Sequence, residues 1–127
     1  MRAMTTRCRG LFPFVPSGND FARAIEFFAE LGFAVQWRTD DMAGLRFDAA
    51  FFILQKIDIP VWQENQMLTI EVDDLEEYWA AIAGKDLPGR FSGVRLRAPA
   101  DYPWGRELHI VDPAGVCWHV RQLAQPS

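Results

Sequence analysis

The stretch Asp101–Val120 has the sequence DYPWGRELHIVDPAGVCWHV, and it holds two alternations of apolar and polar residues. The first alternation runs through Glu107–Val111 and the second through Val116–Val120. Between them lies Asp112–Gly115, in which proline presets one φ angle and glycine tolerates a positive φ. Two alternating runs joined by such a turn predict a β-hairpin.

Trp104 stands at the entrance to this hairpin, in the segment Pro103–Glu107 with the sequence PWGRE. An aromatic residue beside a glycine can lie flat against a ligand, because glycine lets another group approach the backbone closely. A tryptophan at this place can equally close the end of a hydrophobic core. The hairpin alone leaves both interpretations open.

The composition is that of one globular domain, 1–127, in which 50% of the 127 residues are hydrophobic and 13% aromatic. No run approaches the roughly 18 apolar residues that a membrane helix needs. Met1–Gly10 contains three arginines, but no long apolar segment follows them. We therefore expect a cytoplasmic protein without a signal peptide and without membrane contact.

Charge and cysteine content exclude further classes of protein. The net charge is −4, which disfavours nucleic acid as a partner because a duplex repels an acidic surface. The two cysteines, Cys8 and Cys117, are too few for a disulfide scaffold or a zinc cluster, and they suit a reducing compartment.

The first half of the chain predicts one strand, one helix and three strands. Asn19 or Asp20 caps the helix, and Gly32 ends it in a left-handed conformation. The apolar face of the helix repeats at i, i+3, i+4 and i+7: Phe21, Ala24, Ile25 and Phe28. The predicted strands are Arg9–Val15 before the helix, and Phe33–Arg38, Met42–Phe47 and Ala50–Gln55 after it.

The second half repeats this order. Asp74 caps its helix, and Glu77 three places on completes a capping-box spacing. The apolar face of this helix lies 54 residues after the first one: Leu75, Tyr78, Trp79 and Ile82. The predicted strands are Met67–Val72 before the helix, and Val94–Arg97, Glu107–Val111 and Val116–Arg121 after it, with Ile57–Gln66 as the linker between the halves.

The repeat predicts an α+β fold of two βαβββ modules, at about 9–56 and 66–122. Each sheet has one face covered by its helix, and its other face must be buried elsewhere or line a cavity. The residues expected to pack under the helices are Phe52, Leu54, Leu68, Ile70, Val72 and Trp118. The residues expected on the concave side are Phe51, Ile53, Gln55, Met67, Thr69, Glu71, Cys117, His119 and Arg121.

Five segments carry a resemblance to a known family: AIEFFAELGF at Ala24–Phe33, DDMAG at Asp40–Gly44, DLEEYW at Asp74–Trp79, PWGRE at Pro103–Glu107 and DPAGVCWHV at Asp112–Val120. With its paired modules the chain resembles the vicinal oxygen chelate superfamily, also called glyoxalase/bleomycin resistance/dioxygenase. It is most similar to the bleomycin-binding resistance proteins, for which PWGRE followed by DPAGxCxH is the more particular motif. The resemblance implies a curved mixed sheet around a concave cleft.

Enzymes of this superfamily hold a divalent metal on the concave side, with one ligand from the first and one from the last strand of each module. Here three of these positions fall on Leu11–Phe14, Ile53 and Met67, which offer no donor side chain. Only His119 fits. The resemblance therefore implies no metal, no cofactor and no catalysis.

The two histidines have different expected environments. His119 either contacts a ligand or is a neutral imidazole that hydrogen-bonds to a neighbouring group. His109 lies one residue from the apolar stripe of its strand, where we expect a half-exposed surface position.

In the resistance proteins two aromatic side chains sandwich a flat drug in a crevice at the dimer interface, and acidic residues meet its cationic tail. When the site of the resistance proteins is mapped onto this sequence, the resemblance implies that Trp104 is the stacking residue. Met42 then stands where those proteins have the aromatic partner, and Gln36 stands where they have an acidic residue. The ligand-binding residues implied are Trp37, Met42, Glu64, Asn65, Thr69, Trp104 and His119.

The function implied is that of a bleomycin-resistance-like protein, which binds and sequesters a small planar or amphipathic ligand without chemistry, cationic ligands included. Pro13 corresponds to a proline that helps an N-terminal arm cross to the other subunit in the resistance proteins. We therefore expect a homodimer whose crevices use residues of both chains.

Two other functions fit the same fold. One is a metal-dependent lyase or dioxygenase with an atypical site, for which the candidates are Glu71, Glu107, Cys117 and His119. The other is a structural or regulatory domain whose cavity is filled by its own bulky side chains, namely Phe12, Phe14, Trp37 and Phe51.

Overall fold

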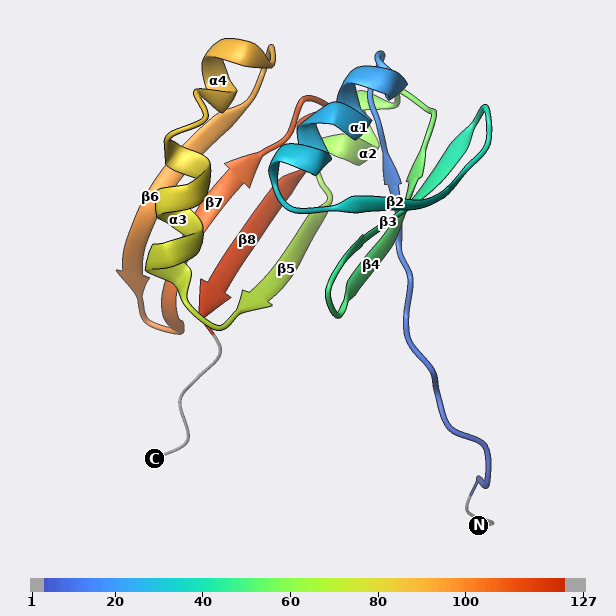
Figure 1. Cartoon of the computed structure of the whole chain (residues 1–127), viewed down its shortest axis with the longest axis horizontal. Helices are drawn as coiled ribbons and strands as arrows, with labels where there is room; N and C mark the ends of the chain where they lie inside the picture. Colours follow the sequence, from blue (N-terminus) through green and yellow to red (C-terminus); the bar gives the residue numbers. More distant parts are fainter. Residues whose placement is uncertain (1–3, 123–127) are drawn as a thin grey trace.

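The computed structural model describes residues 4–122 and consists of two four-stranded sheets with helices packed on them (Figure 1). The first half contains β1 (Phe14–Pro16), α1 (Phe21–Glu30), β2 (Ala34–Arg38), β3 (Met42–Phe47) and β4 (Ala50–Gln55). The second half contains β5 (Met67–Val72), α3 (Leu75–Ala83), α4 (Leu87–Arg90), β6 (Arg95–Tyr102), β7 (Gly105–Val111) and β8 (Cys117–Gln122), and α2 (Pro60–Gln63) lies between the halves. Residues 1–3 and 123–127 of the predicted domain lie outside the described part.

The two sheets have the same topology. Their strand orders are β1-β4-β3-β2 and β5-β8-β7-β6, and in each the first strand of the module pairs in parallel with the last. The other neighbours are antiparallel. The predicted α+β fold of two βαβββ modules is confirmed.

Several predicted boundaries are wrong, and prolines explain most of them. The linker contains α2 and the segment before β6 contains α4, because proline at the first turn of a helix costs no hydrogen bond. β6 continues past Pro99 to Tyr102, since a bulge between Arg97 and Ala100 accommodates a residue without an N–H. β1 begins at Phe14 rather than Arg9, and residues 4–12 are exposed.

The helix caps follow the sequence. Asp20 accepts a hydrogen bond from Arg23 N, Asp74 accepts one from Glu77 N, and Gly32 has a φ of +110°. The predicted apolar face of α1 is buried throughout. In α3 only Leu75 and Ile82 are buried, while Tyr78 is half-buried because its ring stacks on Phe47 near the surface.

Trp118 joins the two halves in a shared core. Its ring, which is 2% exposed, lies within 6.2 Å (centroid to centroid) of Phe28, Phe33 and Phe52 from the first half. Tyr78 adds a polar tie, because its hydroxyl donates to Leu31 O at 2.8 Å. The helix-facing sides of both sheets thus contribute to one core.

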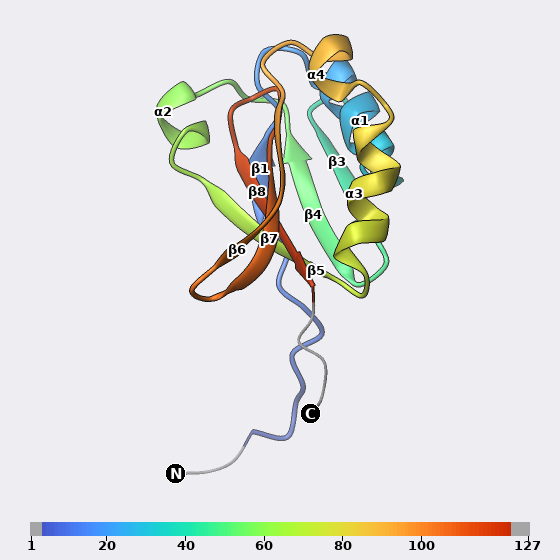
Figure 2. The same cartoon turned by 90° about the vertical axis from the view of Figure 1, so that its left-hand side faces the viewer.

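α1, α3 and α4 lie on one side of the strands and α2 on the other (Figure 2). We call the sheet faces turned away from α1 and α3 the open faces. In β5 the predicted alternation is confirmed, since Ile70 is buried while Met67, Thr69 and Glu71 are exposed. Large apolar side chains on or near the open faces are exposed, among them Phe14 (52%), Trp37 (39%) and Met67 (68%). No helix within residues 4–122 is long and apolar enough to span a membrane.

Candidate functional site

The turn at Asp112–Gly115 sets the geometry of the second open face. The buried carboxylate of Asp112 accepts hydrogen bonds from Ala114 N, Val116 N and Trp118 Nε1, at 2.9 to 3.0 Å. Burial raises the pKa of Asp112 to about 6, although these N–H donors act in the opposite direction. The turn fixes the register of β7 on β8, in which His109 stands opposite His119 and Val111 opposite Cys117.

Glu107 lies at the centre of a cluster with these two histidines. Because side chains alternate along a strand, Glu107 and His109 share the open face of β7. Glu107 Oε1 lies 3.4 Å from His109 Nε2, and Glu107 Oε2 lies 3.4 Å from His119 Nδ1. The side chain of Glu107 is only 4% exposed.

Trp104 is held in place over this cluster. Its ring stacks on Tyr102 with 5.0 Å between centroids and an interplanar angle of 11°, and its Nε1 donates to Glu107 Oε1 at 2.6 Å. At 62% exposed, Trp104 does not close the core. Burial raises the pKa of Glu107, but the hydrogen bond from Trp104 and the two nearby histidine rings outweigh it and hold this pKa below its ordinary value.

Cys117 is a weak candidate for a nucleophile. Burial, together with the charge of Glu107, raises the pKa of its thiol, and the thiolate is the reactive form. Its Sγ lies 3.7 Å from His119 Nε2. The polar neighbours of His119 are therefore Cys117 and Glu107.

The open face of the first sheet carries Trp37 on β2. Its indole lies over Gly44 of β3, where an added Cβ would stand 2.4 Å from Trp37 Nε1. Met42 begins the same strand. Phe12 contacts Phe51 edge to face at 4.9 Å but is itself 46% exposed, so these rings do not fill an internal cavity as the structural-domain interpretation required.

Glu64 and Asn65 lie at the end of α2, where a buried residue that sequence reasoning missed holds the segment. Gln63, 2% exposed, donates from Nε2 to Ala114 O in the hairpin turn at 2.9 Å. Asn65 donates to Val61 O and helps to line an apolar pocket of 500 Å³ between α2 and β1.

The predicted ligand-binding residues thus fall in three places. Thr69 and His119 lie on the second sheet, where they stand side by side in the register, and Trp104 lies in the turn between β6 and β7 of the same sheet. Trp37 and Met42 lie on the first sheet, and Glu64 and Asn65 on α2. The pockets of the described chain at α2, at the hairpin turn and at α3 each contain one of these residues, so their joint role in one site stays a prediction.

Sequence reasoning did not group Glu107, His109 and His119. Their potential ligand atoms lie within 4.8 Å of one another. The signal was present, because two residues at i, i+2 and a partner across the predicted hairpin share a face. His109 is less exposed than expected, at 18%, because it packs between Tyr102 and His119.

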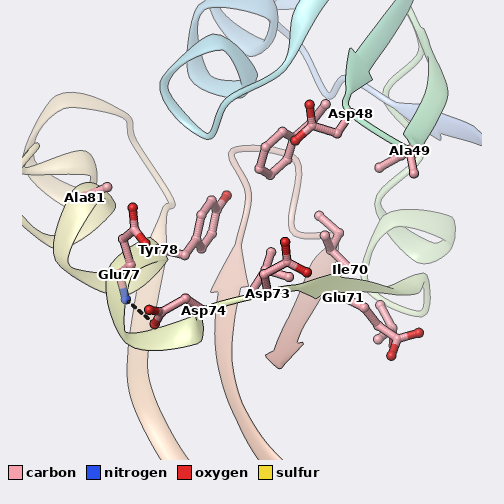
Figure 3. A pocket seen from close by; sticks show the side chains of 13 residues that line it. Asp48, Ala49, Ile70, Glu71, Asp73, Asp74, Glu77, Tyr78 and Ala81 are labelled. Carbon is pink, nitrogen blue, oxygen red and sulfur yellow. Dashed lines mark hydrogen bonds between the residues drawn. The ribbon is translucent and has the colours of Figure 1, made fainter. Parts of the chain in front are cut away.

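An acidic pocket of 690 Å³ lies between α3 and the β3–β4 turn (Figure 3). The stacked rings of Phe47 and Tyr78 form part of its wall. Its carboxylates are Asp48, Glu71, Asp73, Asp74 and Glu77, and neither lysine nor arginine is among its described lining residues. Such a surface attracts cations.

The comparisons with known proteins concern the whole chain. No family model matches the sequence, and no curated protein sequence matches it significantly. Among solved structures, a bleomycin-binding protein complexed with bleomycin is 23% identical with a TM-score of 0.79, covering 92% of this chain and 100% of that one. The chain has the fold of the bleomycin-binding proteins.

Two further structures share this bleomycin-binding-protein fold. The bleomycin resistance determinant encoded on transposon Tn5 is 23% identical with a TM-score of 0.80, over 93% of this chain and 100% of that one. The bleomycin-binding protein of Streptomyces verticillus, complexed with copper(II)-bleomycin, is 22% identical with a TM-score of 0.77, over 94% and 100%. The resemblance inferred from the sequence motifs is confirmed for the fold.

Proposed function

We propose that this protein binds and sequesters a small planar or amphipathic ligand of the bleomycin type, without catalysing a reaction. The proposal rests on the exposure and fixed position of Trp104. Its side chain is 62% exposed, and yet stacking on Tyr102 and a hydrogen bond to Glu107 hold it in place. A ring that is exposed and already ordered loses little entropy when a flat ligand stacks on it.

Stacking and charge together favour a flat, cationic ligand. An aromatic pair contributes about 0.5–1.5 kcal/mol beyond the burial of area. Trp37 offers a second exposed ring, on the other open face. The net charge of −4 favours cations over anions.

The proposal includes a homodimer. Trp37 lies on the first sheet and Trp104 in the β6–β7 turn of the second, and a symmetric partner can bring the open face of one subunit against that of the other. The exposed apolar side chains of Phe14, Trp62 and Met67 are the type of residue that such an interface buries.

We propose that the protein does not catalyse a reaction because of the side chains at two metal-ligand positions of the superfamily enzymes and at Cys117. Ile53 and Met67 stand where the superfamily enzymes place metal ligands, and neither side chain is a usual ligand for a hard divalent metal. The raised thiol pKa of Cys117 argues against covalent catalysis.

A titration with metal-free bleomycin tests the proposal. We expect quenching of the fluorescence of the five tryptophans, and we expect Trp104→Ala to remove most of the quenching and to weaken binding about five- to tenfold, the equivalent of one lost stacking contact. Mass spectrometry should recover the drug unchanged after prolonged incubation.

Trp79→Phe is the matched control, because Trp79 lies on α3 against the core and its loss also removes one fluorophore. It should retain the affinity of the wild type. Failure of the wild type to bind bleomycin in calorimetry would contradict the proposal, and equal affinity in Trp104→Ala would remove Trp104 from the site.

A further inference from the structure

Glu107, His109 and His119 form a compact donor set within one module. Glu107 and His109 are two residues apart on β7, and His119 stands directly opposite His109 on β8. The two imidazole rings meet edge to face, with 4.5 Å between centroids. All three side chains come from one rigid hairpin, so their arrangement does not depend on a second module or subunit.

The separations of the donor atoms suit a small divalent ion. Glu107 Oε1 lies 3.4 Å from His109 Nε2, Glu107 Oε2 lies 3.4 Å from His119 Nδ1, and the ligand atoms of the three residues lie within 4.8 Å of one another. Ligands about 2.1 Å from a tetrahedral metal ion are separated by about 3.4 Å from one another. Two imidazoles and one carboxylate are ligands that Zn²⁺, Cu²⁺ and Fe²⁺ accept, and they leave coordination positions free.

The neighbouring groups orient the donors. Trp104 Nε1 donates to Glu107 Oε1, which fixes the carboxylate, and Cys117 Sγ lies beside His119 Nε2, which leaves Nδ1 to face Glu107. Such outer contacts hold the ligand residues of metal sites in place.

His109 provides an independent sign of a missing partner. Its Nε2 is buried and makes no hydrogen bond of good geometry with any residue of the described chain, although it faces Glu107. A buried polar atom without a partner is costly, and native proteins rarely retain one unless a bound species satisfies it.

We propose that Glu107, His109 and His119 bind a divalent transition-metal ion, with the Glu107 carboxylate, His109 Nε2 and His119 Nδ1 as ligands. This site differs from that of the superfamily enzymes, whose ligands come from both modules, and it shares only the position of His119 with it. Three protein ligands leave a coordination position free, which a nitrogen or oxygen donor of a small molecule can complete. The inference goes beyond the proposed function and does not require bleomycin.

Zinc titration of the protein without an affinity tag, after removal of metal with a chelator, tests the inference. Calorimetry should give one Zn²⁺ per chain. Because the sequence contains only two histidines, NMR of the imidazole nitrogens should show both rings shifting on addition of Zn²⁺, at Nε2 of His109 and Nδ1 of His119. This readout on the wild type does not depend on the folding of any variant.

Variants assign the ligands. His109→Asn and Glu107→Gln should each weaken Zn²⁺ binding about a hundredfold. Loss of a residue that only orients a ligand costs up to about this factor, and loss of a ligand itself should cost no less. Glu71→Gln is the matched control, since Glu71 is a half-exposed carboxylate on the same open face, 3.9 Å from Arg121, and its removal should change affinity less than twofold. Zn²⁺ that leaves both imidazole signals unmoved, or that binds His109→Asn as tightly as the wild type, would overturn the inference.

Discussion

Gly44 allows Trp37 to lie flat on the first sheet. A Cβ at this position would stand 2.4 Å from Trp37 Nε1 and 2.8 Å from Phe51 Cζ, closer than atoms can approach. Gly44→Ala should therefore displace the Trp37 indole, and overpacking of this kind costs about 1–3 kcal/mol of unfolding free energy. Since Trp37 is 39% exposed and can swing outward, we expect the lower end of this range. Urea unfolding and the indole N–H resonance of Trp37 provide the measurements.

Gly84→Ala is the control for this substitution. Gly84 has a φ of −79°, and an added Cβ would meet only Ala80 O at 3.9 Å. This variant should be as stable as the wild type and leave the Trp37 resonance in place. An unshifted Trp37 resonance in Gly44→Ala would show that the indole does not rest on this glycine.

At the residue scale, the sequence predicted on which face of its sheet most side chains lie, but it did not predict which side chains form a cluster there. Alternation correctly placed Thr69, Cys117 and His119 on one face, because strand geometry determines it locally. The burial of Glu107 depends on Trp104 and on two histidines from different strands, and such a cluster exists only after the hairpin register is set. His109 was for this reason assigned to a half-exposed position.

Asp112 in the hairpin turn makes the unfolding free energy of the protein depend on pH. Because folding raises the pKa of Asp112 from 3.8 to about 6, the folded protein binds more protons than the unfolded chain between these pH values. The contribution of Asp112 to stability should therefore fall as pH rises through this window, by about 3 kcal/mol for two pKa units.

Asp112→Asn isolates this effect, because asparagine does not titrate. We expect the unfolding free energy of the wild type, relative to that of the variant, to be greater at pH 4 than at pH 7, as measured by urea denaturation at both values. A relative stability that instead increases with pH would show that the N–H groups of Ala114, Val116 and Trp118 outweigh burial and hold Asp112 ionised.

At the scale of elements, the sequence predicted the long helices and the succession of strands along the chain but not the one-turn helices α2 and α4. The helical periodicity and the caps at Asp20 and Asp74 are local signals, and they appear as predicted. No helix was predicted in the linker Ile57–Gln66 or between Ile82 and Val94, whereas Pro60 and Pro88 each stand in the first turn of a short helix there. Gln63 illustrates the limit, because its burial depends on Ala114, 51 residues away.

The whole molecule exposes apolar surface that a second copy would cover. Residues 4–12 run away from the sheets (Figure 1), with Leu11 90% exposed, and Phe14, Val61, Trp62 and Met67 are each more than half exposed. Exposed apolar surface of this kind is typical of subunit interfaces. We therefore expect sedimentation equilibrium at micromolar concentration to give twice the chain mass of 14.5 kDa.

Phe14→Glu tests which face forms the dimer. Phe14 lies on β1 next to Ile53 and lines the apolar pocket with Trp62, so a carboxylate there would be buried without a partner in the dimer while remaining exposed in the monomer. At a cost of about 3 kcal/mol for each of the two carboxylates in a symmetric dimer, the dimer should dissociate about 10,000-fold more readily. Val35→Glu should leave the dimer intact, because Val35 is similarly exposed, at 46%, but stands opposite Leu45, whose side chain is buried on the helix side of the sheet. A wild type that sediments as a monomer would contradict the interface, whereas dissociation of Val35→Glu but not of Phe14→Glu would place it on the edge strand β2 instead of the open face.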